Sequence, residues 1–564
     1  MIRCAHAGVV YFRVVYELNK LSNYKSVQRL THFYTTIPFL QTLFKNKKHL
    51  LNYHIRHFGL GTNVKNAYDT IYALSSGSGK CAVAVIRISG AQTRLAMEKM
   101  CGGLTKPRIA NLRKLQDPNT KEDIDKALVI WFPGPHSFTG EDIAEFHVHG
   151  GPAVISSVLS ALGTLSGFRP AKPGEFTKQA FLNGKLDLTE IEGLGDLIHA
   201  ETEAQRKQAL RQMDGVLNIL YSSWRNRLTK CLANTTAFID FSEEENIEDN
   251  ILEHVFSEVC NIKDEVSAHL NDSRRGERLR DGLHVVILGE PNVGKSSLLN
   301  AISQRPAAIV SPIAGTTRDV VETALNIAGY PVLLSDTAGL RATVDVVEKE
   351  GIHRAVNRAK IADLKIIVLH PDIIKQTHFS DLTFADFVTS YMNHLLQDSG
   401  TMNSTQYSSP SNSHINEHYF SAEHNSPSTN QHIDMTNILL VFNKIDLVNE
   451  NRSELFQHFK DNMCFLSCTT GEGFDSFMKV LVMKIQNLCG DPSVGSPSLT
   501  QVRHRHHLNK CVLHLTQFNT YSQEDIVLAS EQLRLAANEL GQVTGQISTE
   551  DVLNVIFRDF CIGK

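Results

Sequence analysis

The chain has 564 residues, of which 42 % are hydrophobic and 21 % are charged, and its formal net charge is −4. This composition is ordinary for a globular protein, and it excludes a collagen, a wholly disordered chain and a disulfide-dense miniprotein. At roughly 150 residues per domain, the length predicts about three or four domains.

The first 66 residues differ from the rest in charge. They hold ten Lys or Arg and one acidic residue, Glu17, which gives +9, so the other 498 residues carry −13. The basic residues are Arg3, Arg13, Lys20, Lys25, Arg29, Lys45, Lys47, Lys48, Arg56 and Lys65. A basic, acid-poor, amphipathic N-terminus is typical of a transit peptide, so we predict a leader over 1–66 and import into the mitochondrial matrix. The alternative is a basic arm that contacts RNA. A secretory signal is disfavoured, because Arg13 interrupts the apolar stretch Ala7–Tyr16.

Hydropathy and cysteine spacing bound the protein class further. No apolar run approaches the roughly 18 residues that span a bilayer, so no membrane span is expected. The ten cysteines include no CxxC pair, which argues against a zinc ribbon and a disulfide framework. A reducing compartment fits this usage, and we expect most of the thiols to be buried as small hydrophobes.

Residues 67–187 mix short strand-like runs, Cys81–Ile88 and Ala127–Phe132, with Gly/Pro turns. A helical stretch is predicted from about Leu188 to Arg280, since apolar residues recur there at helical spacing. The last region, from about Gln501, is also predicted to be helical. It carries an apolar stripe that we interpret as core packing: Ile526, Ala529, Leu533, Ala536, Leu540 and Val543.

Residues 282–488 alternate strand-like and helix-like segments, which predicts an α/β domain. Within this region, Asp398–Asp434 is rich in Ser, Asn, His and Thr and contains no Lys or Arg. It lacks the apolar content that would offset its ordering entropy, so we predict a flexible insertion there.

A phosphate-binding motif opens the α/β region. Gly289–Ser296 reads G-x-x-x-x-G-K-S, follows the strand-like run His284–Leu288 and precedes the helix-like run Ser297–Ile302, which is the context that the motif requires. Its backbone N–H groups are expected to wrap the phosphates at a helix N-terminus. Lys295 is expected to reach the β- and γ-phosphates and Ser296 to bind Mg²⁺.

Three further motifs follow in order and predict GTP rather than ATP. Asp336–Gly339 comes after the strand-like run Val332–Leu334 and is suited to hold Mg²⁺ through water and to meet the γ-phosphate. Asn443–Asp446 follows Ile438–Phe442, and its carboxylate can accept two hydrogen bonds from guanine that adenine would leave unmade. Ser467-Cys468 lies where GTPases place their last base-contacting loop. The predicted GTP-binding residues are Asn292, Val293, Gly294, Lys295, Ser296, Ser297, Ser311, Thr316, Thr317, Asp336, Thr337, Ala338, Gly339, Asn443, Lys444, Asp446 and Ser467.

The expected hydrolytic machinery differs from that of Ras. Ras-like proteins place a water-orienting Gln directly after the motif that corresponds to Asp336–Gly339, where this chain has Leu340. Asn292, together with the backbone of Ser311–Thr316, resembles a potassium-binding loop, in which a monovalent cation takes the place of an arginine finger. Thr317, in the segment Gly315–Asp319, suits the mobile Mg²⁺-binding switch, so the predicted Mg²⁺ ligands are Ser296 and Thr317. We therefore predict hydrolysis that depends on both Mg²⁺ and K⁺.

Motifs outside the GTPase region carry a family resemblance. They are Val85–Gly90, Phe132–Asp142, Pro173–Thr177, Phe181–Leu188 and the tail Cys561–Lys564. Together with the GTPase motifs they resemble the tRNA-modifying GTPase family MnmE (TrmE), in its mitochondrial form, over Ala67–Lys564 apart from an insertion at about 371–436.

The resemblance implies a multidomain α/β plus α fold. An N-terminal α/β domain at 67–187 would bind folate and form a homodimer. A discontinuous helical domain would comprise 188–280 and 488–564, and a Ras-like P-loop GTPase domain would be inserted at 281–487. The family acts with an FAD flavoprotein partner of the MnmG type on C5 of the wobble uridine. A taurinomethyl-type group on mitochondrial tRNA is implied, with the one-carbon unit from 5,10-methylenetetrahydrofolate (or 5-formyltetrahydrofolate as the bound form).

The resemblance also implies roles for particular residues. It assigns folate contacts to Arg87, Glu145, Lys185 and Lys564, and potassium contacts to Asn292, Ser311, Ile313 and Thr316. Glu348 would position the attacking water through a second water. Cys561 would be required for tRNA modification, with a structural thiol as its alternative. Without the resemblance, Arg87 and Lys185 read as solvated surface charges.

Two other functions compete with this interpretation. A ribosome-assembly GTPase would carry a compact RNA-binding module, and the sequence shows neither a KH-type GXXG nor a basic patch on the acidic body. A membrane-remodelling or scaffold GTPase would need a basic amphipathic helix or an apolar anchor. The acidic body is also poorly suited to hold tRNA by bulk charge, so local patches or the flavoprotein partner are expected to supply that contact.

Overall fold

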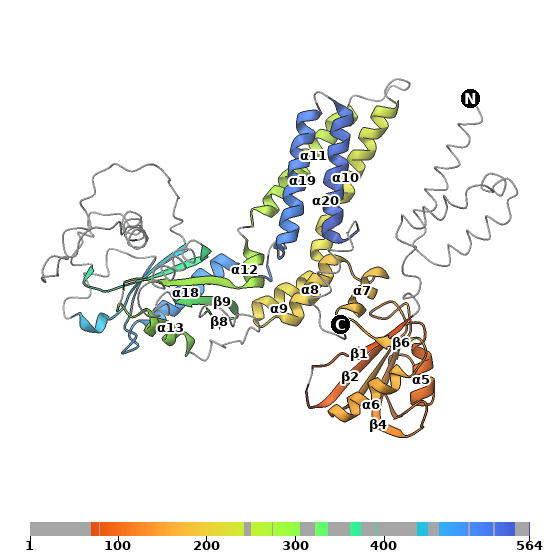
Figure 1. Ribbon diagram of the computed structural model, residues 1–564. Coiled ribbons are helices and arrows are strands. Elements are labelled where there is room, and N and C mark those ends of the chain that lie inside the picture. The colour runs from red at the N-terminus through yellow and green to blue at the C-terminus, as the bar shows by residue number, and fades with distance from the viewer. Residues whose placement is uncertain are drawn as a thin grey trace, which may run out of the picture. The chain divides into compact units, whose positions relative to one another are not determined.

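The computed structural model describes residues 69–77, 79–241, 250–272, 274–290, 292–304, 322–336, 361–373, 391, 437–448, 462–494, 497–522, 525–546 and 563 (Figure 1). The chain forms two compact units, Met1–Phe176 with Ile562–Lys564, and Thr177–Cys561. The predicted leader and nearly all of the predicted insertion lie outside the described residues. No helix in the described part of the chain combines the length and the apolar character needed to cross a bilayer.

The first unit is built on a six-stranded sheet with the strand order β3-β4-β5-β2-β1-β6. Neighbouring strands are antiparallel, except that β1 and β6 are parallel. The elements are β1 (Thr70–Leu74), β2 (Cys81–Ser89), α5 (Thr93–Cys101), β3 (Asn111–Gln116), β4 (Asp123–Phe132), β5 (Ile143–Gly150), α6 (Pro152–Gly163), β6 (Phe168–Pro170) and α7 (Glu175–Leu182), whose last residues belong to the second unit.

Alternation along β2 shows why this sheet has one buried face. Ala84, Ile86 and Ile88 are fully buried, whereas the residues between them are less buried, as a period of two requires. The buried face packs against apolar side chains of α5 and α6, among them Met97 and Leu162. The strand predicted at Cys81–Ile88 is confirmed, and the one predicted at Ala127–Phe132 lies within the longer β4.

The α/β part of the second unit has a six-stranded sheet with the order β12-β11-β10-β7-β9-β8. All of its pairs are parallel except β8 with β9. Its elements are β7 (Leu283–Leu288), α13 (Lys295–Ser303), β8 (Glu322–Ile327), β9 (Tyr330–Asp336), β10 (Leu364–Leu369), β11 (Ile438–Phe442), the 3₁₀ turn η3 (Ile445–Leu447), β12 (Met463–Phe465) and α18 (Phe474–Cys489). Apolar clusters cover both faces of the sheet, as expected for a mainly parallel sheet, and confirm the predicted α/β class here.

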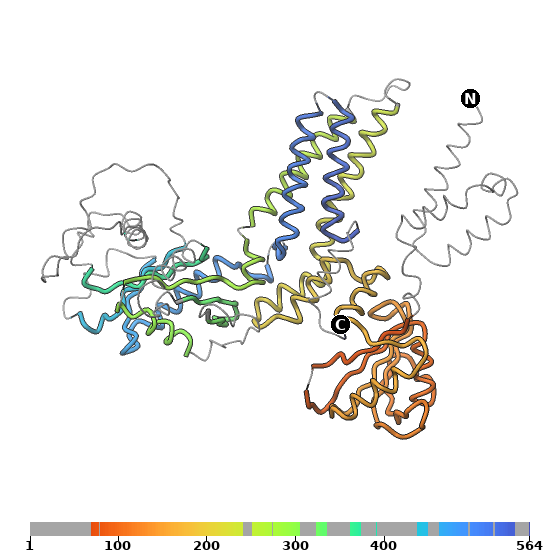
Figure 2. Tube along the Cα trace, in the orientation of Figure 1, coloured from red at the N-terminus to blue at the C-terminus, as the bar shows by residue number. Residues whose placement is uncertain are grey.

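The helical part of the second unit consists of α8 (Leu188–His199), α9 (Glu203–Met213), α10 (Val216–Phe241), α11 (Asn250–Leu270), α12 (Arg275–Asp281), α19 (Val502–Tyr521) and α20 (Ile526–Thr544). The long helices α10, α11, α19 and α20 run side by side as a bundle around a shared apolar core (Figure 2). Within the described part of 188–280, the predicted helical stretch comprises α8, α9, α10, α11 and α12 rather than one continuous helix. One break follows from chemistry: Thr202 and Gln205 form a reciprocal capping box that starts α9.

The apolar stripe of the last helix is core packing, as predicted. Ala529, Leu533, Ala536, Leu540 and Val543 are all buried in the bundle. Most of the described cysteines are buried, and Cys81 is the exposed one among them. Burial raises the pKa of the Cys101 and Cys511 thiols to about 12, which keeps both thiols protonated and inert.

A buried charge cluster joins α8 to the start of α19. Glu192 is 8 % exposed, accepts a hydrogen bond from Arg503 Nε at 3.0 Å and lies 2.7 Å from His504 Nε2. Burial alone raises the pKa of the Glu192 carboxyl, but His504 and Arg503 outweigh burial and hold that pKa below its usual range. Arg503 also donates to the carbonyls of Gln542 and Val543 at the end of α20.

We expect Glu192→Gln to lower the free energy of unfolding by about 3 kcal/mol at pH 7, because it removes one partner of a buried charge pair. The native pKa is depressed, so the stabilisation is fully present above the unfolded-state pKa of about 4.3 and is lost as the pH falls through the native pKa. Urea unfolding of both proteins at pH 7 and at lower pH measures this difference, which should shrink on acidification.

The matched control is Glu531→Gln, since Glu531 pairs with Arg534 on the exposed face of α20 with both side chains about half exposed. This change should cost under about 1 kcal/mol. If both variants lose the same free energy of unfolding, or if the loss in Glu192→Gln does not depend on pH, then the buried charge pair of Glu192 does not stabilise the fold as stated.

Candidate GTP-binding site

The phosphate-binding motif lies between β7 and α13, and two of its glycines are fixed by close approaches. Gly289 has φ +148°, and a Cβ there would lie 2.3 Å from Val368 O of β10. Gly294 has φ +102°, and a Cβ there would lie 2.1 Å from Asn443 Nδ2. Neither position can accept a side chain without moving the backbone or Asn443, so both glycines follow from geometry.

The ammonium group of the motif's lysine is hydrogen-bonded to backbone carbonyls of the phosphate loop. Lys295 is 8 % exposed, and its Nζ donates to Gly289 O at 2.9 Å and to Glu290 O at 2.8 Å. Ser296 and Ser297 are exposed in the first turn of α13. Backbone N–H groups, the positive end of the helix dipole and an ammonium group thus converge where an anion is favoured.

Asn443 joins three of the predicted motifs. It follows β11 and is 2 % exposed. Its Nδ2 donates to Val293 O in the phosphate loop at 2.9 Å, and its Oδ1 accepts from Cys468 N at 3.1 Å. Lys444 Nζ donates to Asn292 O at 2.7 Å. The Asn443 amide and the Lys444 ammonium group therefore connect the segment after β11 to the phosphate loop, and Asn443 also connects it to the loop after β12.

Asp446 presents an unsatisfied acceptor beside this junction. Its Oδ1 is buried and has no hydrogen-bond partner among the described residues. Ser467, in the neighbouring loop, is fully buried, and its Oγ accepts from Thr469 N and Thr470 N, which holds that loop in shape. A buried acceptor without a partner calls for a donor. The N1–H and N2–H groups of guanine are such donors, whereas adenine has no equivalent pair.

The remaining predicted GTPase residues are placed only in part. Asp336 is the last residue of β9 and pairs in register with Ile287 of β7, close to the start of the phosphate loop. The other predicted residues of this site lie outside the described residues: Ser311, Ile313, Thr316, Thr317, Thr337, Ala338, Gly339 and Glu348.

Two of the predicted folate contacts meet in the first unit. Arg87 and Glu145 are opposite each other on β2 and β5, with Arg87 Nη2 2.9 Å from Glu145 Oε1. The Arg87 guanidinium also lies 5.7 Å and 5.8 Å from the ring centroids of Phe138 and Phe176. Its side chain is 18 % exposed, so the alternative interpretation of Arg87 as a solvated surface charge is wrong.

The contact of Arg87 with the two phenylalanines was not predicted, although both rings lie in the motifs that carry the family resemblance. Arg87 and Glu145 satisfy each other's charge, and a ligand that used both would share these hydrogen bonds. Lys185 belongs to the second unit and is exposed, where it lines a cavity with Asp187 and Glu190.

The C-terminal tail is described at one residue. Gly563 has φ +98°, and a Cβ there would lie 2.3 Å from Leu74 O. Its carbonyl accepts a hydrogen bond from Ser75 Oγ at 2.8 Å. Gly563 is thereby anchored at the end of β1, and a glycine is required there by the close approach. Cys561 and Lys564 lie outside the described residues.

Comparison with known proteins shows extensive similarity. The sequence profile of the MnmE helical domain matches residues 188–561, and that of the GTP-binding protein TrmE N-terminus matches residues 70–185. The "5-taurinomethyluridine-[tRNA] synthase subunit GTPB3, mitochondrial" of Danio rerio is 50 % identical over 502 residues, which cover 88 % of this chain and 93 % of that protein. The Homo sapiens protein of the same name is 47 % identical over 88 % of this chain and 93 % of its own length. The "tRNA modification GTPase MnmE" of Parvibaculum lavamentivorans is 43 % identical, with 88 % of this chain and 100 % of that protein covered.

Proposed function

Because the chain belongs to the MnmE (TrmE) family of tRNA modification GTPases, we propose that it hydrolyses GTP in mitochondria to drive the modification of C5 of the wobble uridine of mitochondrial tRNAs. The product proposed is a taurinomethyl-type group, in keeping with the names of its vertebrate relatives. The observation that carries the GTPase assignment is the buried Oδ1 of Asp446, which has no hydrogen-bond partner within the described part of the chain and lies beside an asparagine that is bonded to the phosphate loop.

The chain's own residues divide the work on GTP. The loop N–H groups and Lys295 bind the phosphates, and Asn443 holds the loop against the base-binding segment while Asp446 accepts the guanine edge. Leu340 cannot orient water, so Glu348 is proposed to position the nucleophile. Mg²⁺ at Ser296 and Thr317, and K⁺ at Asn292, Ser311, Ile313 and Thr316, would supply the positive charge that offsets the developing negative charge.

The uridine chemistry is proposed to use a folate and a flavoprotein. Arg87 and Glu145, together with Lys185 and Lys564, would bind a tetrahydrofolate that donates the one-carbon unit, and Cys561 would serve the modification step. An FAD flavoprotein of the MnmG type would complete the complex, and a homodimer would form through residues 67–187. These domain limits, the helical domain at 188–280 and 488–564 and the GTPase domain at 281–487 remain predictions.

Nucleoside analysis of mitochondrial tRNA after loss of the protein tests the proposed function. We expect the modified wobble uridine to disappear and the unmodified uridine to take its place. Unchanged wobble uridines together with depleted ribosomal subunits would favour the competing function, a ribosome-assembly GTPase, and would overturn this proposal.

We expect K⁺ to accelerate GTP hydrolysis by at least about tenfold over Na⁺ at matched ionic strength, since a cation that offsets transition-state charge contributes several kcal/mol. Steady-state phosphate release in KCl and in NaCl measures this ratio. Equal turnover in the two salts would show that another group neutralises the charge.

A further inference from the structure

Two chain segments connect the GTPase sheet to the helical bundle, and they are bonded to each other. The incoming segment contains Asp272 and α12, and the outgoing segment runs from the end of α18 to Thr500. Leu499 N donates to Asp272 Oδ2 at 3.1 Å. A Cβ on Gly276 would lie 2.2 Å from Leu499 O, so the two backbones touch. We refer to α12, the described residues 488–494 and 497–500 of the outgoing segment, and Arg505 together as the joint.

On one side, the joint is hydrogen-bonded to the GTPase sheet at the start of β10. Arg278 Nε of α12 donates to Asp363 Oδ1 at 2.8 Å, and Arg278 Nη1 donates to Leu488 O at 3.3 Å. Asp363 Oδ2 accepts from His284 N at the start of β7 at 3.1 Å. Asp363 directly precedes β10, and Leu369 O at the other end of β10 accepts from Asn443 N at 3.0 Å. One strand therefore runs from the joint to the residue that holds the guanine-binding segment.

On the other side, the joint is bonded to the helical bundle through Arg505. Glu277 of α12 is 2 % exposed and accepts from Arg505 Nε of α19 at 2.6 Å. Arg505 also donates to Leu270 O, in the last turn of α11, at 2.7 Å and to Asp272 Oδ1 at 3.0 Å. Burial raises the pKa of Glu277, but Arg505 and Arg274 outweigh burial and hold it below the usual range, so the pair stays charged near neutral pH. A single guanidinium thus joins α19, α11 and α12 by charge-assisted bonds.

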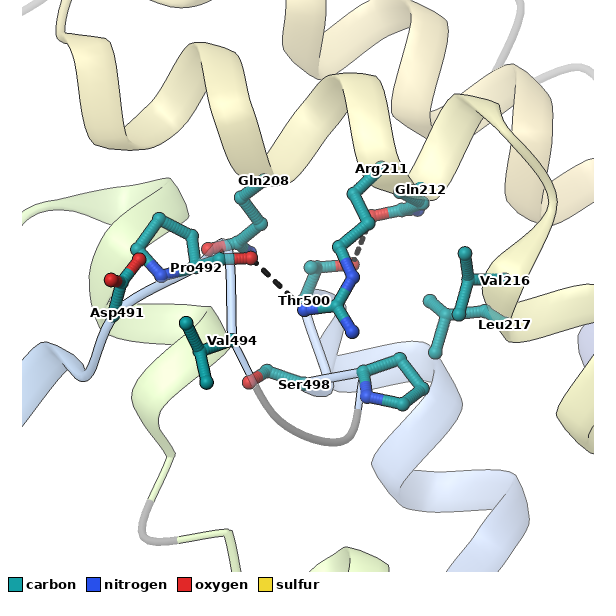
Figure 3. A pocket seen from close by; sticks show the side chains of 11 residues that line it. Gln208, Arg211, Gln212, Val216, Leu217, Asp491, Pro492, Val494, Ser498 and Thr500 are labelled. Carbon is teal, nitrogen blue, oxygen red and sulfur yellow. Dashed lines mark hydrogen bonds between the residues drawn. The ribbon is translucent and has the colours of Figure 1, made fainter.

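The outgoing segment is fixed against α9 as well (Figure 3). Thr500 Oγ1 donates to Gln212 Oε1 at 2.8 Å, and Arg211 Nη1 donates to Pro492 O at 3.0 Å. Gln212 is 3 % exposed, and its Nε2 donates to Thr189 O of α8 at 3.0 Å. A small cavity remains beside these bonds and is lined in part by Gln208, Val216 and Ser498.

We propose that Arg505 and Arg278 are positioning residues that carry motion of the GTPase sheet into the helical bundle. Both faces of α12 are bonded, so a shift of β10 and β7 moves α12 and the end of α11 with it. Coupling requires such a shared element, because a freely jointed linker would absorb the same shift. This inference rests on the proposed function, since GTP turnover must act on a tRNA modification that takes place away from the nucleotide.

The test compares Arg505→Gln and Asp363→Asn in the full-length protein with its flavoprotein partner and tRNA. Neither residue belongs to the nucleotide site. We expect GTP turnover within about twofold of the unsubstituted protein and at least about tenfold less modified tRNA per GTP hydrolysed. Arg534→Gln is the matched control, since it removes an arginine of the same bundle whose ion pair among the described residues is with the half-exposed Glu531. Turnover and modification that fall in parallel, or modification that is unchanged, would overturn the proposal.

A double variant separates positioning from general destabilisation. If Arg505 and Asp363 act on one path, Arg505→Gln with Asp363→Asn should modify tRNA no worse than the poorer single variant, whereas independent structural damage should multiply the two losses. Multiplied losses would overturn the proposal. Thermal unfolding of each variant accompanies the assay.

A second readout does not depend on tRNA. Spin labels attached through unnatural side chains at exposed Val527 of α20 and exposed Met483 of α18 report the distance between bundle and GTPase. We expect the distance distribution to broaden in Arg505→Gln and not in Arg534→Gln. An unbroadened distribution would overturn the joint. If the distance distribution broadens in Arg505→Gln but the unsubstituted protein modifies no tRNA, the joint is supported and the proposed function is refuted.

Discussion

Asp446→Asn is expected to lower the affinity for GTP by at least about 100-fold and to create binding of XTP. The carboxylate of Asp446 can accept from both N1–H and N2–H of guanine, and its buried Oδ1 has no other partner among the residues described. An asparagine presents one acceptor and one donor. It therefore faces the guanine amino group with a like donor, but it matches xanthine, which has a carbonyl oxygen in place of that amino group.

Competition of GTP, XTP and ATP against a fluorescent guanine nucleotide measures the switch. The XTP arm is an internal control, because a variant that had lost its fold would bind none of the three. GTP affinity that is unchanged, or XTP affinity that does not rise, would show that Asp446 does not read the base. The thermal stability of the nucleotide-free protein should hardly change, since Oδ1 makes no hydrogen bond to the described residues that the substitution would break.

Gly294→Ala is expected to reduce nucleotide affinity by about 100-fold while the protein remains folded. A Cβ at this position would lie 2.1 Å from Asn443 Nδ2, and φ is +102°. Relief of the clash must move Asn443 away from Val293 O and Cys468 N, which loosens the phosphate loop and the base-contacting loop together. The cost is about 3 kcal/mol, which corresponds to about 100-fold in affinity.

The matched control is Gly102→Ala in the first unit. Gly102 also has a positive φ, +73°, but a Cβ there would meet nothing within 4 Å. This variant should lose about 1 kcal/mol of stability from backbone strain and bind GTP normally. Isothermal titration of both variants with GTP decides the matter. A Gly294→Ala protein that binds GTP as tightly as the Gly102→Ala protein would contradict the role assigned to the contact with Asn443.

Local elements were predictable where one signal dominated. The strand at Ile438–Phe442 matches β11 at both ends, because five apolar residues bounded by polar ones fit a strand that is buried on both faces. The predicted run Ser297–Ile302 is the core of α13, which starts two residues earlier because Lys295 already lies in the first turn after Gly294. The strand predicted at Val332–Leu334 extends to Tyr330–Asp336, since pairing with β7 and β8 continues past the apolar residues.

The candidate site was predictable as a set of motifs but not as a set of contacts. Spacing identified Gly294, Asn443 and Asp446, because each carries chemistry that only certain residue types supply. That Asn443 bonds to Val293, 150 residues away in the chain, is visible only in the folded structure. In the same way, Arg87 reads as a surface charge when taken alone, but pairing of β2 with β5 places Glu145 opposite it.

The sequence by itself determined the order of the GTPase motifs, the apolar stripe of α20 and the family resemblance, because these depend on residue type and short spacing. Only the tertiary structure decided which arginines hold the molecule together. Arg505 lies in a run of Arg and His that has the appearance of a solvated basic segment, yet it bonds to Leu270, Asp272 and Glu277, more than 220 residues earlier. Such contacts depend on how separate helices and strands pack, and no local pattern records the partner of a charge that folding brings from so far along the chain.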